Sequence, residues 1–435
     1  MSERMLAVVG ADPVNLKLIE GLEGFEDLRV VPVLAKTDCQ PPRETIDFDR
    51  LYEQARETLD ALDRPPDAMI GYLDFPVTAL LALLRRDYGL PGASPEAVAK
   101  CEHKFWMRQE QAKILPDDTP AVAALNPFAP KDARRAAPPY PFWLKPVKGH
   151  SSVLGFKVEK DRDLEEALAA CRQKIHLFGT PFNQFLAHVD VPEEIAPYDG
   201  NFAIAEEMIS AERQFTLEGY VFEGETVIYG AVDSVRAGST ASSFARYQYP
   251  ADLPDAVIAR CRDLTGQILA HFGYDGSPFN VEFFWDPKTD RLNLLEINTR
   301  ISKSHAPLFA MVDGASHHKV AIELSMGRRP DMPVRSGKDS FAAKFMLRSF
   351  EPDGLVVRMP HEDEITELKR LLPDVQVELI AQENGRLSDL PYQDSYSYEL
   401  ADLFLGGQSP QMLEDCYNRC LDSLTVLIKP LPKPS

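Results

Sequence analysis

The chain has 435 residues, of which 44% are hydrophobic and 26% are charged, a composition typical of a soluble protein with about two to four lobes. Its 47 basic and 67 acidic residues give a formal net charge of −20, which argues against a general affinity for nucleic acid or anionic membranes. No stretch approaches the roughly 18 apolar residues that a membrane span needs, and no signal peptide is evident. Six cysteines without a CxxC pair favour reduced thiols, so we expect a cytoplasmic protein.

The first 93 residues alternate between strand patterns and helix patterns. Apolar strands are predicted at 5–10, 28–35 and 68–72, and helices at 14–22, 51–62 and 77–88. This alternation predicts a small Rossmann-like parallel α/β lobe. No GxGxxG motif follows the first strand, so a nicotinamide site is not expected there. Asp74 follows the third strand, where ligands of open α/β sheets bind, although an N-cap is the commoner use of such an Asp.

The next segments carry two lysines and a loop rich in small residues. Ser94 fits an N-cap before Pro95, and the helix predicted over 97–109 carries Lys104. A Pro- and Ala-rich passage over 116–141 suggests a linker or lobe crossing, and the strand predicted over 141–146 carries Lys145. The loop over 148–155 offers glycines and the hydroxyls of Ser151 and Ser152, which suit phosphate oxygens. Without GxxxxGK[ST] it is not a P-loop, and taken by itself the segment is more often an ordinary hairpin turn.

A strand predicted over 202–210 ends in polar residues, and antiparallel strands follow at 215–223 and 226–235. We interpret the end of the first strand as an extended hinge whose backbone reads a purine edge, with an apolar side chain against the ring. Glu212 or Gln214 would contact the ribose, and the alternatives stay open. The hinge consists of Glu206, Glu207, Met208 and Ile209.

After a helix predicted over 254–272, the segment 279–300, FNVEFFWDPKTDRLNLLEINTR, has the pattern of a β-hairpin with a longer loop. If Asp286 pairs with Leu292, then Glu282 lies opposite Glu296 and Asn280 lies opposite Asn298. Opposed carboxylates repel each other unless a hard divalent cation binds between them. Glu282, Glu296 and Asn298 are therefore candidate magnesium ligands. From the hairpin alone, a solvent-facing strand pair whose acids never meet is an equal alternative.

Three further residues, Arg236, Ser304 and His305, are candidate substrate contacts, and His305 could equally cap a helix. The passage 328–338 suggests a domain boundary. Strands predicted at 342–347, 355–358 and 375–380 and a helix at 410–428 predict a small α+β lobe at the C-terminal end.

From about residue 90 to 330 the chain resembles the ATP-grasp superfamily. Four motifs carry the resemblance in the family's order: LPGASPEAVAKCEHK, PFWLKPVKGHSSVLGF, AEEMI and VEFFWDPKTDRLNLLEINTR. It implies ATP bound by Lys104 and Lys145, magnesium at Glu282, Glu296 and Asn298, and Arg300 on the transferred phosphate or the substrate carboxylate. Two metal ions are expected, with Mn²⁺ as an alternative to Mg²⁺. We expect Arg300, Glu296 and Lys145 to be catalytic.

The resemblance also implies an organisation and an activity. We expect an N-terminal α/β domain at 1–93, an ATP-grasp domain at 94–330 with a lid over about 116–205, and a C-terminal lobe at 331–435. The implied enzyme is an ADP-forming ligase that joins a small carboxylic acid or amino acid to an amine through an acyl phosphate. A thiol acceptor stays open, and homodimers are common among the proteins that it resembles.

Two alternatives are weighed against this ligase. A biotin-carboxylase-type enzyme would activate bicarbonate, but its characteristic basic run is not evident, because 234–249 offers only Arg236 and Arg246. A non-catalytic nucleotide-binding protein would be expected to have lost a metal acid or a phosphate lysine, and none is missing.

Overall fold

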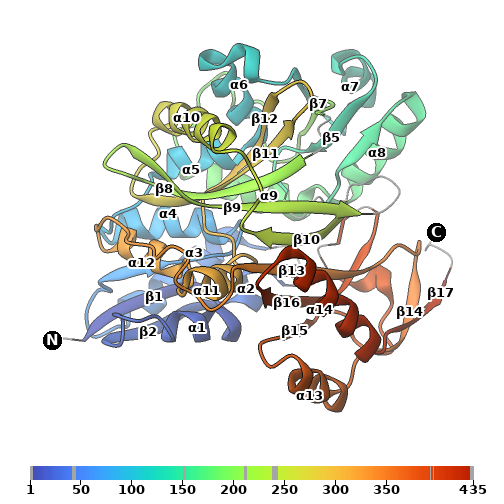
Figure 1. Cartoon of the computed structure of the whole chain (residues 1–435). Helices are drawn as coiled ribbons and strands as arrows, with labels where there is room; N and C mark the ends of the chain where they lie inside the picture. The colour runs from blue at the N-terminus through green and yellow to red at the C-terminus, as the bar shows by residue number, and fades with distance from the viewer. Residues whose placement is uncertain are drawn as a thin grey trace. The chain divides into compact units, whose positions relative to one another are not determined.

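The structure is a computed structural model that describes residues 3–41, 46–149, 153–209, 213–237, 243–391, 393–394 and 396–431 (Figure 1). Its contacts divide the chain into two compact units. The first unit comprises Met1–Tyr229, Leu253–Lys303 and His318–Asp331, and the second comprises Gly230–Asp252, Ser304–His317 and Met332–Ser435. This division does not separate the first 93 residues from those that follow, and the three domains expected above stay a prediction.

The first unit begins with a three-stranded parallel sheet in the order β2-β1-β3. Its strands are β1 (Arg4–Ala11), β2 (Leu28–Ala35) and β3 (Ala68–Ile70), accompanied by α1 (Pro13–Glu20), α2 (Lys36–Cys39), α3 (Phe48–Asp60) and α4 (Val77–Asp87). The central strand β1 is apolar along its length because both of its faces are covered. The α/β lobe expected from the alternating pattern is confirmed, and Asp74 follows β3 at the carboxyl edge of the sheet.

Two short helices follow where a single helix was expected. The first is α5 (Pro95–Glu102), in which the side chain of Ser94 caps the N-terminus by accepting from the Ala97 N–H at 3.1 Å. The chain then breaks at His103, whose Nδ1 accepts from the Trp106 N–H and so caps α6 (Lys104–Ile114). This second start places Lys104 at the first position of a helix, a position that helical periodicity did not predict.

A four-stranded antiparallel sheet follows in the order β4-β7-β5-β6. It consists of β4 (Val122–Leu125), β7 (Ala203–Glu207), β5 (Phe142–Pro146) and β6 (Phe156–Val158), with a 3₁₀ turn at Pro116–Asp118 and helices α7 (Pro130–Ala136), α8 (Asp161–Lys174) and α9 (His176–Leu186). Its apolar face packs on α7 and α8. The passage expected to be a linker therefore contains β4 and α7. Helix α9 was missed because Gly179 and Pro181 interrupt its pattern.

The remaining strands of the first unit lie in the order β12-β11-β8-β9. They are β12 (Arg291–Asn298), β11 (Ser277–Asp286), β8 (Arg213–Phe222) and the first part of β9 (Glu225–Ala237), with helices α10 (Asp255–Phe272) and α12 (His318–Ser325). The hairpin of β11 and β12 has the expected pairs Glu282 with Glu296 and Asn280 with Asn298. The starting pair was wrong, because Asp286 pairs with Arg291 and not with Leu292.

The second unit contains the later part of β9, followed in the sheet by β10, β13, β16 and β15. These strands are β10 (Ser243–Tyr249), β13 (Phe341–Ser349), β16 (Tyr398–Gly407) and β15 (Gln376–Leu379), and β14 (Gly354–Arg358) pairs separately with β17 (Leu427–Pro430). The α-helices are α11 (Ala306–Asp313), α13 (Glu362–Leu371) and α14 (Pro410–Ser423). A 3₁₀ turn lies at Leu387–Asp389. The α+β character is as expected, but β10, β16 and α13 were missed, and α14 ends before the predicted Ile428.

No helix in the described ranges is long and apolar enough to cross a membrane. The six cysteines are free thiols and all are buried.

Candidate functional site

Three neighbouring strands of the first unit place a row of mostly polar side chains on one face of their sheet. The register sets Glu282 of β11 opposite Thr216 of β8 on one side and Glu296 of β12 on the other. Side chains of directly opposed residues point to the same face of the sheet, and so do those of every second residue along each strand. Residues of the opposite parity, such as Phe215 and Val281, are fully buried core. We call the first set the polar face: Gln214, Thr216, Glu218, Asn280, Glu282, Phe284, Asn293, Glu296 and Asn298.

A β-bulge decides which residues of β12 join the polar face. Leu295 has no directly opposed partner in β11, so the strand carries one extra residue there. In an uninterrupted strand, Leu292 and Leu294 would share a face with Glu296. The extra residue reverses the alternation, both leucines are buried on the core side, and Asn293 instead joins Glu296. The bulge thus connects two parts of the site that a regular strand would place on opposite faces.

The candidate metal ligands are held by hydrogen bonds along the polar face. Gln214 donates through Nε2 to Glu282 Oε2 at 2.9 Å, and Asn298 donates through Nδ2 to Asn280 Oδ1 at 3.1 Å. Because the amide nitrogen of Asn298 is engaged in this way, its Oδ1 is left as an acceptor. Two opposed carboxylates and an amide oxygen are the hard ligands that Mg²⁺ prefers, so this donor set fits magnesium.

Lys104 connects Glu296 to the start of the loop that follows β5. Its Nζ donates to the Gly149 carbonyl oxygen at 2.9 Å and lies 3.6 Å from Glu296 Oε2. Burial raises the pKa of Glu296, but the positive charges of Lys104 and Lys145 outweigh it, and the net shift is downward. The carboxylate is therefore ionised at neutral pH, as a ligand of a hard cation must be.

Lys145 on β5 is held by Glu206 on the neighbouring strand β7. The two side chains form an ion pair at 2.6 Å, and Arg108 of α6 binds the other oxygen of Glu206 at 2.7 Å. Burial would raise the pKa of Glu206, but the charges of Arg108 and Lys145 outweigh it and lower the pKa to about 2. Arg108 also donates to the Leu295 carbonyl oxygen at 2.8 Å, at the bulge. The Glu206 side chain thus orients Lys145, whereas the hinge residues after it lie at a pocket.

Lys148 is a charged residue of the site that sequence reasoning did not single out. Its ammonium forms an ion pair with Glu102 of α5 and lies 5.3 Å and 5.8 Å from the ring centres of Phe75 and Phe182. Burial lowers the pKa of Lys148 to about 8, although the negative charges of Asp74 and Glu296 oppose this. A lysine in a polar loop is usually solvent-exposed, and only the packing of distant segments shows that this one is buried.

Arg300 and Asp74 form an ion pair across more than two hundred residues of sequence. Asp74 Oδ1 accepts from Arg300 Nε at 2.8 Å and lies 2.6 Å from Nη2. Burial would lower the pKa of Arg300, but the charge of Asp74 outweighs it and raises the pKa, so the guanidinium stays charged. The end of β12 is thereby connected to the carboxyl edge of the N-terminal parallel sheet.

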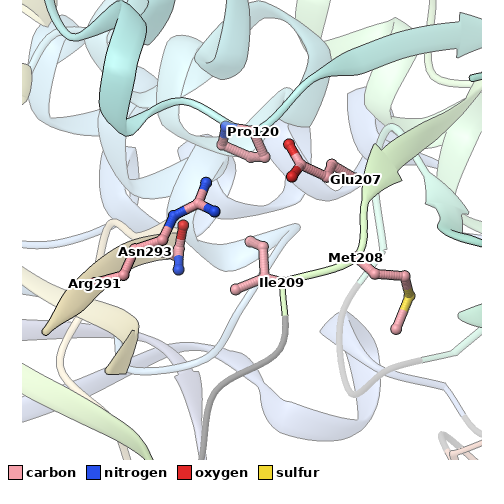
Figure 2. A pocket seen from close by; sticks show the side chains of 6 residues that line it. All are labelled: Pro120, Glu207, Met208, Ile209, Arg291 and Asn293. Carbon is pink, nitrogen blue, oxygen red and sulfur yellow. The ribbon is translucent and has the colours of Figure 1, made fainter. Parts of the chain in front are cut away.

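A pocket opens between the hinge and the start of β12 (Figure 2). The empty space there measures about 280 Å³, part of which is open solvent. In Figure 2 the side chains of Arg291 and Asn293 project toward Pro120 and Ile209, whereas Met208 points away from them. Sequence reasoning missed Arg291, Asn293 and Pro120 as pocket residues. The first two lie in the motif VEFFWDPKTDRLNLLEINTR but were given no role, and Pro120 lies in the passage that was expected to be a linker. The residues that line the pocket are Pro120, Glu207, Met208, Ile209, Arg291 and Asn293.

The remaining candidates lie elsewhere. Ser151, Ser152 and Glu212 are outside the described residues. Arg236, on β9, places its guanidinium over the Phe244 ring in the second unit. His305, also in the second unit, is buried at the N-terminus of α11 with its ring 5.0 Å from that of Tyr247, and Ser304 precedes it.

Comparison with known proteins identifies the fold. An L-amino acid ligase from Bacillus licheniformis matches over 98% of this chain and 99% of its own, with a TM-score of 0.68 and 16% identity. The biotin carboxylase domain dimer of a 2-oxoglutarate carboxylase from Hydrogenobacter thermophilus, solved with MgADP, ADP and bicarbonate, matches over 98% of this chain and 91% of its own. Its TM-score is 0.61 and its identity 14%. These similarities establish a multidomain α/β fold that the chain shares with an amino acid ligase and a biotin carboxylase domain.

Part of the chain also matches a known domain family. Residues 138–306 match the ATP-grasp domain family, so the chain contains an ATP-grasp domain, and the resemblance expected from the sequence is confirmed. The carbamoyl phosphate synthase large chain of Thermus thermophilus is 29% identical over 187 residues. That alignment covers 41% of this chain and 18% of the curated protein. It relates the two proteins over a part of each.

Proposed function

We propose that this protein is an ATP-dependent carboxylate–amine ligase. It would join an amino acid or small carboxylic acid to an amine through an acyl phosphate and release ADP and phosphate. One observation supports this most directly: the opposed carboxylates of Glu282 and Glu296 share the polar face with Asn298, and Lys104 contacts Glu296. Two facing acids beside a buried lysine are costly in a plain sheet, whereas a metal–phosphate complex satisfies all of them.

The first task of the site is to bind the nucleotide phosphates. Glu282, Glu296 and Asn298 would hold magnesium, which when bound offsets negative charge on the phosphoryl group. Lys104 and Lys145 would contribute positive charge to the phosphates. Glu206 keeps Lys145 extended toward this position through their ion pair at 2.6 Å. The pocket between the hinge and β12 would take the nucleobase.

The second task is to hold the acid and the amine. A guanidinium presents several N–H groups in a planar fork, and Asp74 engages only the Nε and Nη2 side of Arg300. Nη1 also donates to the Ile301 carbonyl oxygen at 3.4 Å, and a carboxylate or phosphate oxygen would bind the N–H groups that remain. Asp74 would in turn attract the ammonium group of an amino acid substrate. Ser304, His305 and Arg236 stay candidate substrate contacts, and the loop over 148–155 would keep water from the acyl phosphate.

The test is to incubate the purified protein with magnesium-ATP and pools of amino acids and small carboxylic acids. Nucleotide products and new masses are followed together. We expect ADP and phosphate only when a particular acid and amine are both present, together with their condensation product. AMP and pyrophosphate would refute the acyl-phosphate route. ADP formation that needs bicarbonate and biotin would instead identify a biotin-carboxylase-type enzyme. Size-exclusion chromatography of the same preparation tests whether this protein is also a homodimer.

The metal assignment is tested separately by Glu296→Gln. We expect this variant to fold normally and to lose turnover, because the amide keeps the shape of the side chain but removes a charged metal ligand. Glu225→Gln is the matched control, since Glu225 lies in the same sheet in an exposed ion pair with Arg329. The control should keep full activity. Substantial ADP formation by Glu296→Gln, with its unfolding temperature unchanged, would count against the metal site.

A further inference from the structure

The polar face carries two rows of directly opposed side chains across β8, β11 and β12. One row contains the candidate metal carboxylates of Glu282 and Glu296, and the other consists of Glu218, Asn280 and Asn298. Asn298 is half-buried, whereas Glu218 and Asn280 are 0% and 3% exposed. The second row therefore has one accessible end, at the candidate ligand Asn298, and two buried members behind it.

Hydrogen bonds connect this second row in one direction. Asn298 Nδ2 donates to Asn280 Oδ1 at 3.1 Å, and Asn280 Nδ2 donates to Glu218 Oε1 at 2.6 Å. Both amide nitrogens thus face toward Glu218. The row ends in Asn298 Oδ1, and an amide oxygen is a good ligand for a hard cation.

The direction of the row is set at its Glu218 end. Burial lowers the pKa of Arg300, but Asp74 and, to a smaller extent, Glu218 raise it, so Glu218 lies near a positive charge. An ionised carboxylate only accepts hydrogen bonds, whereas an amide can turn over and exchange its donor for its acceptor. With an acceptor at one end, both amides must turn their nitrogens toward it. If the row ran in the opposite direction, Asn298 would present N–H groups, which repel a cation.

We propose that Glu218 is a positioning residue that makes Asn298 present its oxygen, and not its nitrogen, to the bound metal. The carboxylate would act through Asn280, from a strand that lies two places away from β12 in the sheet. Groups that orient metal ligands from behind typically contribute about ten- to hundredfold to metal affinity or activity. An amide ligand depends on such a group more than a carboxylate does, because only one of its two terminal atoms can bind a cation. This inference rests on the metal and nucleotide use proposed above.

The experiment measures the binding of ADP by calorimetry in two forms, as an equimolar complex with Mn²⁺ and without metal in EDTA. Mn²⁺ prefers the same oxygen ligands as Mg²⁺. Glu218→Gln keeps the shape of the side chain but can donate as well as accept, so the row is free to reverse. We expect this variant to bind MnADP about tenfold more weakly than the native protein does, and to bind metal-free ADP equally well. Glu225→Gln, which removes an exposed acid of the same sheet, should keep both native affinities.

A second substitution separates orientation from charge. In Asn298→Asp both terminal atoms of the side chain are oxygens, so its orientation no longer matters. Glu218→Gln introduced into this background should therefore weaken MnADP binding much less than it does in the native protein. A loss that came only from the missing charge would be the same in both backgrounds. The unfolding temperature gives an independent readout, because Asn298→Asp alone places acceptors at both ends of Asn280. Adding Glu218→Gln should then raise this temperature, since glutamine can donate to Asn280.

Equal losses of MnADP affinity in the two backgrounds would overturn the inference. So would a Glu218→Gln protein that unfolds at a lower temperature but keeps the native affinity for MnADP, because Glu218 would then serve only the stability of the sheet. Should Glu218→Gln be too unstable to titrate, a double variant that unfolds below Asn298→Asp would overturn the inference as well. The proposed function fails instead if the native protein binds neither form of ADP, or binds MnADP no more tightly than metal-free ADP.

Discussion

The buried charged side chains at the candidate site form ion pairs and are not isolated. Arg108, Glu206 and Lys145 form one network, and Glu102 and Lys148 form a separate pair. Removing one partner of a buried ion pair destabilises a protein strongly, because the other charge stays buried without compensation. Replacing both partners by apolar groups of the same shape is often neutral. These ion pairs therefore hold Lys145 and Lys148 in position in the absence of a ligand.

The pair of Lys148 and Glu102 gives a prediction at this scale. Lys148→Met should lower the free energy of unfolding by about 3–5 kcal/mol, because Glu102 would be left buried without its counter-charge. Glu102→Gln should be destabilising for the converse reason. The double variant should recover most of the loss, because methionine packs well against the rings of Phe75 and Phe182. Urea unfolding of the four proteins measures this cycle. Additive single effects would show that the two side chains do not act as a pair.

At the scale of elements, the hairpin of β11 and β12 shows what could and could not be predicted from sequence. The pairing of Glu282 with Glu296 was predicted correctly, but from a starting pair that was shifted by one residue, and the bulge in β12 makes up for that shift. The bulge itself was not predicted, because Leu295 looks like one more apolar residue in a strand, and its effect depends on the carbonyl contact with Arg108 from a distant helix. The same limit hid Asn293 and Lys148. Local patterns predict elements, whereas burial of a polar group depends on segments far apart in the chain.

Deletion of Leu295 tests the role of the bulge. With one residue fewer, either Leu292 and Leu294 leave the core, or Glu296 and Asn298 turn into it. Both outcomes should abolish nucleotide binding in calorimetry and lower the free energy of unfolding by about 3 kcal/mol or more.

The control is deletion of Lys288 from the exposed turn of the same hairpin. This deletion shortens the loop but does not change which side chains of β12 point to each face of the sheet. We expect this control to bind ATP normally. If the protein without Leu295 bound ATP as tightly as the control, the polar face could not depend on the bulge.

At the scale of the whole molecule, the chain passes repeatedly between its two compact units. The candidate metal, lysine and pocket residues all belong to the first unit, although they come from segments between Asp74 and Arg300. The sequence predicted the order and class of most elements because each has its own periodicity. It could not predict that 230–252 and 304–317 join the second unit, since unit membership depends on tertiary packing.

This membership leads to the last prediction. The contiguous segment 332–435 should not fold cooperatively by itself, because it lacks β10 and α11. Strand β10 pairs along one edge of β13, and without it that edge is exposed to aggregation. Helix α11 is tied to the same part of the unit: Tyr249 donates to Asp313 at 2.7 Å, and the Arg335 N–H donates to the other oxygen of Asp313 at 2.8 Å.

A fusion of 230–252, 304–317 and 332–435 through flexible glycine–serine linkers should therefore restore a sigmoidal thermal transition in circular dichroism, whereas 332–435 alone should show none. A matched fusion with Tyr249→Phe and Asp313→Ala lacks the hydrogen bonds that tie α11 to β10 and to Arg335. It should unfold at a lower temperature than the first fusion. A sharp transition for 332–435 alone would mean that the long β13 and β16 pairing, with α13 and α14 packed on it, is sufficient for a stable core.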